Sequence, residues 1–147
     1  MSHLVSILVQ TPAHSPVAGP LSYLSEQALA AGTLVRVPFG KRETLGVVWA
    51  NDPLPQDSIN PAKLRAVAGV LEGITPLSAH WQQLVAFASQ YYQRSPGEVA
   101  LAALPPQLRD ISTTQLARRL KRRATAAALP GHDESHAQHP ARHARRL

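Results

Sequence analysis

The sequence predicts a mainly β fold with C-terminal helices, an α+β domain followed by a disordered basic tail. Short apolar, β-branched stretches separated by glycine and proline fill the first half. Apolar residues recur with a helical period after residue 76, and positive charge gathers near the C-terminal end. The 147 residues leave room for one ordinary domain and not for two full cores.

The first half is expected to form short strands joined by turns. The expected strands cover residues 4–9, 34–37, 45–50 and 65–71. Pro38 should end the second of them, and Gly46 indicates a bulge or a close backbone approach in the third. Residues 21–29 are ambiguous. Strands of this length with such turns favour a small sandwich or barrel.

A helix is expected next, because apolar side chains follow one helical stripe. The stripe consists of Leu77, Trp81, Leu84, Val85, Ala88, Tyr91 and Tyr92. Thr75 or Ser78 can cap its start. At this spacing we expect Trp81, Tyr91 and Tyr92 to pack on the sheet.

A second, shorter helix is expected at the next capping signal. Ser95 and Glu98 match a capping box, with Pro96 at the first helical position. Two prolines at 105 and 106 should stop this helix. The two helices together form the helical hairpin of the expected fold.

The net charge of +6 is not spread evenly along the chain. Residues 1–105 hold six basic and six acidic side chains, whereas residues 106–147 hold nine basic and three acidic ones. The basic run consists of Arg118, Arg119, Lys121, Arg122 and Arg123. It is consistent with contact to DNA phosphates, and equally with a solvated linker or the exposed face of a short helix.

The sequence offers no catalytic motif. Gly40 and Lys41 are followed by Arg42, so the hydroxyl of a phosphate-binding loop is absent. The carboxylates up to residue 105 are scattered, and the histidines there have no motif spacing. We therefore expect no enzyme activity, no cofactor and no metal site in this chain. The remaining histidines, His132, His136, His139 and His143, lie in the tail.

The location expected from the sequence is the cytoplasm. The apolar run at residues 4–9 is too short for a signal peptide core or a membrane span. We accordingly expect no membrane partner.

The segment 35–46 is the most informative part of the chain. A glycine at position 40, at a strand end, lets a ligand approach the backbone, and Lys41 and Arg42 beside it could hold phosphate. An ordinary hairpin with a solvated tip is the other interpretation of these residues.

Six pieces of the sequence occur in an order that resembles a known family. One piece spans residues 35–48 and combines Val-Arg-Val-Pro-Phe-Gly-Lys at 35–41 with Gly-Val-Val at 46–48. The other pieces lie at residues 21–24, 64–67, 88–92, 96–99 and 103–105. Over residues 4–109 the chain resembles the N-terminal domain of the PriA replication-restart helicases, also called primosomal protein N-prime.

The resemblance implies an OB-like barrel that binds the 3′ end of a nascent strand at a stalled or branched fork. By motif, the implied 3′-end site consists of Leu21, Ser22, Tyr23, Gly40 and Arg65. Leu21 stands where the family has an aromatic residue, Ser22 where it has an acid, and Arg65 where it has a lysine. Phosphate contacts would come from Lys41 and Arg42 and from the basic run at 118–123.

The resemblance also predicts domain boundaries and partners. Residues 1–108 would form the OB-like 3′-DNA-binding domain, 109–129 a basic linker that can form a helix, and 130–147 a disordered tail rich in histidine and arginine. Partners would be single-stranded or forked DNA with a free 3′ end, other primosome proteins and single-strand-binding protein. The family's helicase lobes, with their ATP, magnesium and zinc, have no counterpart here. The chain is then a piece of a longer protein, a truncated gene product or a stand-alone derivative.

Two other functions stay open at this point. The domain could be a protein-interaction scaffold of the primosome, with only nonspecific DNA binding through the basic tail. The neutral balance of residues 1–105 favours this alternative. A third possibility is a fragment of an inactivated gene without a cellular role.

Overall fold

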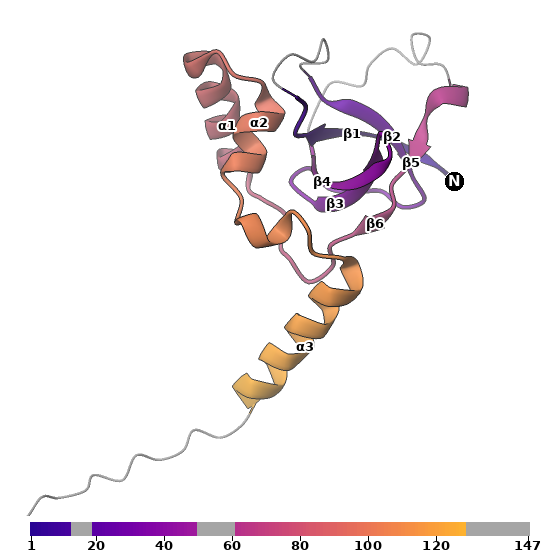
Figure 1. The fold of residues 1–147 in the computed structure, drawn as a ribbon, viewed down its shortest axis with the longest axis vertical. Coiled ribbons are helices and arrows are strands. Elements are labelled where there is room, and N and C mark those ends of the chain that lie inside the picture. The colour runs from indigo at the N-terminus through magenta and orange to yellow at the C-terminus, as the bar shows by residue number, and fades with distance from the viewer. Residues whose placement is uncertain (13–18, 50–60, 129–147) are drawn as a thin grey trace, which may run out of the picture.

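The computed structural model describes residues 1–12, 19–49 and 61–128 of the chain (Figure 1). The elements are β1 (His3–Val9), β2 (Leu21–Ser25), β3 (Leu34–Phe39), β4 (Arg42–Val48), η2 (Pro61–Lys63), β5 (Arg65–Ala66), β6 (Gly69–Val70), α1 (Ala79–Tyr92), α2 (Pro96–Ala102), η3 (Pro106–Leu108) and α3 (Thr113–Ala128). The predicted mainly β fold with C-terminal helices is confirmed.

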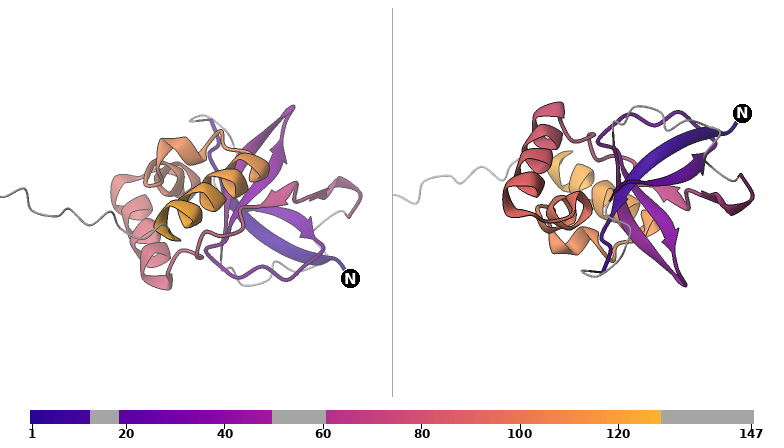
Figure 2. Two further views of the ribbon diagram at one scale, coloured as in Figure 1. Left: turned by 90° about the horizontal axis from the view of Figure 1, so that it is seen from below. Right: turned by 90° about the horizontal axis from the view of Figure 1, so that it is seen from above.

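The six strands form one sheet in the order β5-β2-β1-β4-β3-β6. The sheet curls into a half-barrel, with α1 and α2 beside it (Figures 1 and 2). The predicted strand over 65–71 is two short strands. Between them, Val67 N donates to Leu24 O (2.8 Å) and Ala68 N to Arg36 O (2.9 Å). This segment ties the two edges of the curled sheet together, as an OB-like fold requires.

Two sequence expectations in the β3–β4 hairpin have different outcomes. Pro38 was expected to end the strand but lies within β3, paired with Glu43. On its other side β3 pairs with β6 only at Val35 and Arg36, so Pro38 sits where an edge tolerates a missing N–H. Gly46 is a close approach, since a Cβ there would lie 2.4 Å from Ile7 Cγ2.

Alternating side chains divide the core into two clusters, one on each face of the sheet. The outer core lies between the sheet and the helices and includes Leu8, Leu34, Leu45, Val47, Leu71, Val85, Ala100, Leu101, Leu104, Ile111 and Leu116. The inner core lies within the curl and consists of Val5, Ile7, Val9, Tyr23, Val35, Val37 and Val48. The functional residues described below lie at one end of the inner core.

Helix α1 begins where the sequence predicts, and Trp81 packs against the outer core as expected, but the rest of the predicted stripe is buried only in part. Ser78 Oγ accepts from Trp81 N (3.2 Å), which confirms the cap. The buried side chains are Val85 and Ser89. Tyr91 and Tyr92 are 69% and 68% exposed, so the prediction that they pack in the core is wrong.

The helices that follow extend the packed unit beyond residue 108. The Ser95 cap of α2 is confirmed, because its Oγ accepts from Glu98 N (3.3 Å). Ile111 and Leu116 are both buried in the outer core. The predicted disordered tail at 130–147 lies outside the described residues. Within the described part of the chain, no helix is both long and apolar enough to cross a membrane.

Candidate nucleic-acid interface

The turn between β3 and β4 is an open, positively charged loop end. Gly40 adopts φ 62°, a left-handed conformation that glycine adopts without strain. A Cβ on Gly40 would meet no atom within 4 Å, so the backbone there is accessible from outside. Lys41 and Arg42 are exposed beside it.

Side chains from two neighbouring strands, β2 and β5, hydrogen-bond to backbone carbonyls at the end of β3 and in the turn that follows it. Strands β2 and β5 are parallel, with Tyr23 in register with Arg65. The Tyr23 hydroxyl donates to Pro38 O (3.0 Å). Arg65 Nη1 donates to Gly40 O (2.9 Å). Three of the five implied end-site residues, Tyr23, Gly40 and Arg65, therefore lie around one turn.

The two donors differ in burial and in charge. Tyr23 is buried, and burial raises the pKa of its phenol, although the nearby Arg65 charge lowers it in part. The hydroxyl is therefore a neutral donor at physiological pH. Arg65 is exposed and commits one of its five N–H donors to the turn. Among the described residues the Arg65 side chain makes no other hydrogen bond, so its other donors can face an anionic ligand.

The other two implied residues lie at the beginning of β2. Leu21 is half-buried and packs against the inner core. Ser22 is half-buried opposite Ser6 in β1, and strand alternation places it on the face opposite Tyr23. Among the described residues, neither side chain hydrogen-bonds to Gly40 or Arg65.

The predicted phosphate-binding run lies on a separate element. All five cations between residues 118 and 123 are exposed on α3. The structure describes this run as a regular helix, which the sequence indicated only weakly. Ser112 and Gln115 supply the missed capping signal, since Gln115 N donates to Ser112 Oγ (3.1 Å) and Ser112 N to Gln115 Oε1 (3.2 Å).

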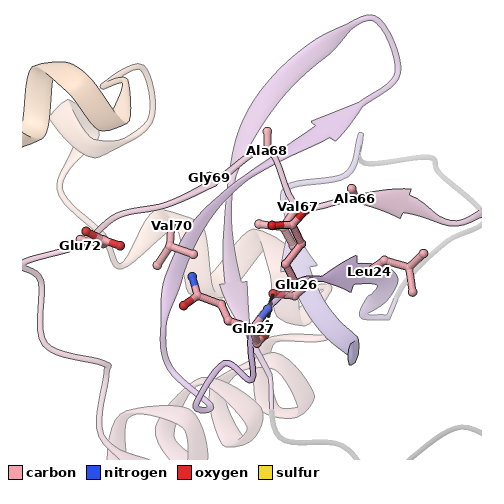
Figure 3. Close-up of a pocket in the computed structure, with 10 residues that line it drawn as sticks. Leu24, Glu26, Gln27, Ala66, Val67, Ala68, Gly69, Val70 and Glu72 are labelled. Atoms are coloured by element: carbon pink, nitrogen blue, oxygen red, sulfur yellow. Dashed lines mark hydrogen bonds between the residues drawn. The ribbon is translucent and has the colours of Figure 1, made fainter. Parts of the chain in front are cut away.

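A pocket of about 550 Å³ lies next to Tyr23 and Arg65 and was not predicted from the sequence. It begins at Leu24 and Ala66, the pair that follows Tyr23 and Arg65 in register. Figure 3 shows Glu26 and Gln27 at the end of β2 facing the segment 66–70. With Glu26 and Glu72 in its lining, this pocket is a poor site for phosphate.

An exposed aromatic surface on α1 was also missed. We call Leu84, Phe87 and Tyr91 the aromatic face of α1; they are 63%, 64% and 69% exposed. The Phe87 and Tyr91 rings stack, with centroids 5.9 Å apart and planes 22° apart. Their i, i+3, i+7 spacing was the available signal, but it is also the spacing of a buried stripe.

Metal ligation finds no support in the described residues. Residues 1–12, 19–49 and 61–128 contain no group of three His, Cys, Asp or Glu side chains that could hold an ion. The histidines that follow residue 130 lie outside the described residues.

A curled β half-barrel with a cation-flanked turn belongs to the class of OB-like nucleic-acid-binding domains. The family model described as the 3′ DNA-binding domain, of PriA, matches residues 6–105. The chain belongs to this family, as the sequence resemblance predicted. The replication restart protein PriA of Rickettsia felis (strain ATCC VR-1525 / URRWXCal2) is 32% identical over 88 residues. That match covers 58% of this chain and 13% of the relative, so the chain corresponds to a small part of it.

Proposed function

We propose that this domain binds the free 3′ end of a DNA strand at stalled or branched replication forks. The observation that carries the proposal is the hydrogen bond from Arg65 Nη1 to Gly40 O, 2.9 Å. It holds a guanidinium beside an accessible glycine backbone. A terminal sugar can approach Gly40 closely, while the spare donors of Arg65 face the preceding phosphate.

Further contacts follow from the surroundings of the turn. Lys41 and Arg42 add two exposed cations for the adjacent phosphates. The family resemblance adds Ser22 and Leu21 to the site, but Ser22 lies on the face of β2 opposite Tyr23, so the proposal rests first on Gly40 and Arg65. Since Leu21 is half-buried and no aromatic residue stands at its position, shape and hydrogen bonding would contribute more than base stacking.

The proposed mechanism is placement of DNA, without a chemical step in this chain. Helicase activity, and assembly with single-strand-binding protein or other primosome proteins, would belong to the longer protein that the relatives represent. The cytoplasmic location expected from the sequence, and in a bacterium an association with the nucleoid at replication forks that follows from the family resemblance, are part of the same proposal.

The experiment compares two strands that differ only at the end. A labelled oligonucleotide with a free 3′-hydroxyl should bind more tightly than the same strand with a 3′-phosphate. Arg65→Ala should weaken binding of the hydroxyl-ended strand. Equal affinity for the two strands would remove end recognition from the proposal and leave general DNA binding.

A second candidate function is protein docking, and the aromatic face of α1 favours it. This helix has no acidic residue in its first turn and no basic residue in its last. Exposed, stacked aromatic side chains of this kind are typical of protein interfaces. Docking would use α1, whereas end binding uses the β3–β4 turn, so the two functions can be separated by substitution.

A further inference from the structure

Helix α3 carries charge of one sign only. Within Thr113–Ala128 there are five cations, at 118, 119, 121, 122 and 123, and no acidic residue. Arg118 and Arg122 are four residues apart, as are Arg119 and Arg123. Like charges at this spacing repel one another on a helix. The basic half of α3 is therefore unfavourable on its own and would gain stability from a polyanion.

The first half of α3 is fixed to the domain. The reciprocal hydrogen bonds of Ser112 and Gln115 cap the N-terminus of α3, because each side chain accepts from the backbone N–H of the other residue. Leu116 is 6% exposed in the outer core, and Leu120 packs against it over Gly73, where a Cβ would lie 2.5 Å from Leu120 Cδ1. The basic half extends beyond this anchor and away from the half-barrel (Figure 1). Its direction is therefore set by the domain, which limits the entropy lost on binding.

The cations cover just over half of the circumference of the helix. At about 100° per residue, they cover roughly 200° of the circumference, centred on Arg122. The opposite side follows Leu116 and Leu120 and continues only with alanines, at 124 and 127. Cations on two sides of a helix suit a ligand that presents phosphates on two sides.

We propose that α3 binds the backbone of double-stranded DNA, lying along a groove with a phosphate row on each side. This inference rests on the proposed DNA-binding function and adds the paired arm of the fork as a second ligand. The major groove is about 12 Å wide and admits an α-helix. A single strand offers only one row of phosphates, so the cations on one side of α3 would have no phosphate to contact.

Other polyanions fit the helix less well. A membrane surface requires large apolar side chains on the face opposite the charges, and α3 has only alanine there after Leu120. An acidic protein partner would find no exposed aromatic or aliphatic anchor on the basic half. Duplex DNA needs neither, because counterion release supplies its affinity.

The test uses the full chain and a covalently closed dumbbell duplex, which has no strand end. The variant replaces Arg118, Arg119, Arg122 and Arg123 with glutamine, a good helix former that lacks charge. Dumbbell binding should fall at least about tenfold. The slope of log K against log salt should fall by up to roughly 3.6, since each of the four phosphate contacts contributes about 0.9.

Two controls keep the result specific. The four arginines replaced with lysine should retain dumbbell binding, which separates charge from a folding defect. The preference for a 3′-hydroxyl over a 3′-phosphate strand should survive the glutamine variant, because that site lies on the barrel. If the wild-type chain itself shows no preference for the 3′-hydroxyl strand, the proposed end binding is contradicted, but the inference about α3 is not.

Three results would overturn the proposal for α3. The first is unchanged dumbbell affinity and salt slope in the glutamine variant. The second is equal competition by single-stranded DNA at matched phosphate concentration. The third is equally tight binding of the wild-type chain to phosphatidylserine vesicles or to polyglutamate, which would assign α3 to a membrane or to an acidic protein.

Discussion

Arg65 on β5 and Gly40 in the β3–β4 turn are joined by a 2.9 Å hydrogen bond across a sequence separation of 25 residues. The contact exists because β5 pairs in parallel with β2, which places Arg65 beside Tyr23 at the end of the inner core. Two side chains therefore fix this end of the hairpin. The neutral, buried Tyr23 hydroxyl donates to Pro38 O in β3, and the charged, exposed Arg65 donates to Gly40 O in the turn. The predictions below follow from this arrangement.

Arg65→Ala should reduce the affinity for a 3′-terminated single strand by about tenfold, or roughly 1.4 kcal/mol. The side chain is exposed, so the free energy of unfolding should change by less than about 1 kcal/mol. Fluorescence anisotropy and urea unfolding measure the two quantities. Arg65→Lys should restore part of the affinity, because it keeps the charge but not the planar fork.

Arg94→Ala is the matched control for that variant. Arg94 is also an exposed arginine, but it lies between α1 and α2, and its Nη1 is 3.5 Å from Glu98 Oε1. Its loss should leave DNA affinity unchanged. An equal effect of both substitutions would show that general charge, and not the turn site, controls binding.

Gly40→Ala should destabilise the domain by about 1–2 kcal/mol, the cost of a left-handed conformation for a residue with a Cβ. The positive φ is the cause, since the space around the added methyl is open. Gly40→Asn should cost less, because asparagine tolerates this conformation better. Urea unfolding of the three chains gives the comparison, and equal stability of all three would contradict it.

Tyr23→Phe should cost about 1 kcal/mol of stability, because Pro38 O loses its donor. It should also change the pH dependence. Burial raises the folded-state pKa of Tyr23, so its contribution to stability is complete below about pH 10, the ordinary tyrosine value. That contribution is lost as the pH rises through the folded-state pKa.

Urea unfolding at several pH values above neutrality tests the Tyr23 prediction. The wild-type chain should lose stability more steeply in alkali than the phenylalanine variant. Parallel curves for the two chains would show that the phenol is not titrating differently in the folded and unfolded states.

Substituting Phe87 and Tyr91 together with alanine should leave both stability and DNA binding nearly unchanged. Both rings are mostly exposed, and each surface substitution is expected to change stability by no more than about 0.5 kcal/mol. Leu101→Ala, in the outer core, should by contrast cost about 2–5 kcal/mol. Loss of DNA affinity in the double variant would place the aromatic face in the DNA site and not in protein docking.

Much of the fold follows from sequence patterns, and the exceptions have physical causes. Strand alternation, the Ser78 and Ser95 caps and the close approach at Gly46 were all predicted. The buried face of α1 was predicted only in part, at Trp81 and Val85, because a serine also stands in it. Ser89 is tolerated there because its hydroxyl donates to Arg94 O (2.6 Å), so no polar group is left unpaired.

The candidate site was less accessible to sequence reasoning. No local pattern connects Arg65 to Gly40, because a parallel strand pair between distant segments brings them together. Only the family resemblance linked them. The capping box at Ser112 was a local signal that could have identified α3, and it was missed beside the more prominent basic run.

The central claim is that the contact between Gly40 and Arg65 forms the 3′-end site. The direct measurement is the ratio of affinities for a 3′-hydroxyl strand and a 3′-phosphate strand, in the wild-type chain and in Arg65→Ala. We predict a ratio well above one for the wild-type chain and a ratio close to one for the variant, because Gly40 O loses the Arg65 donor that fixes the turn against which the terminal sugar lies. A high ratio that persists without Arg65 would contradict the account.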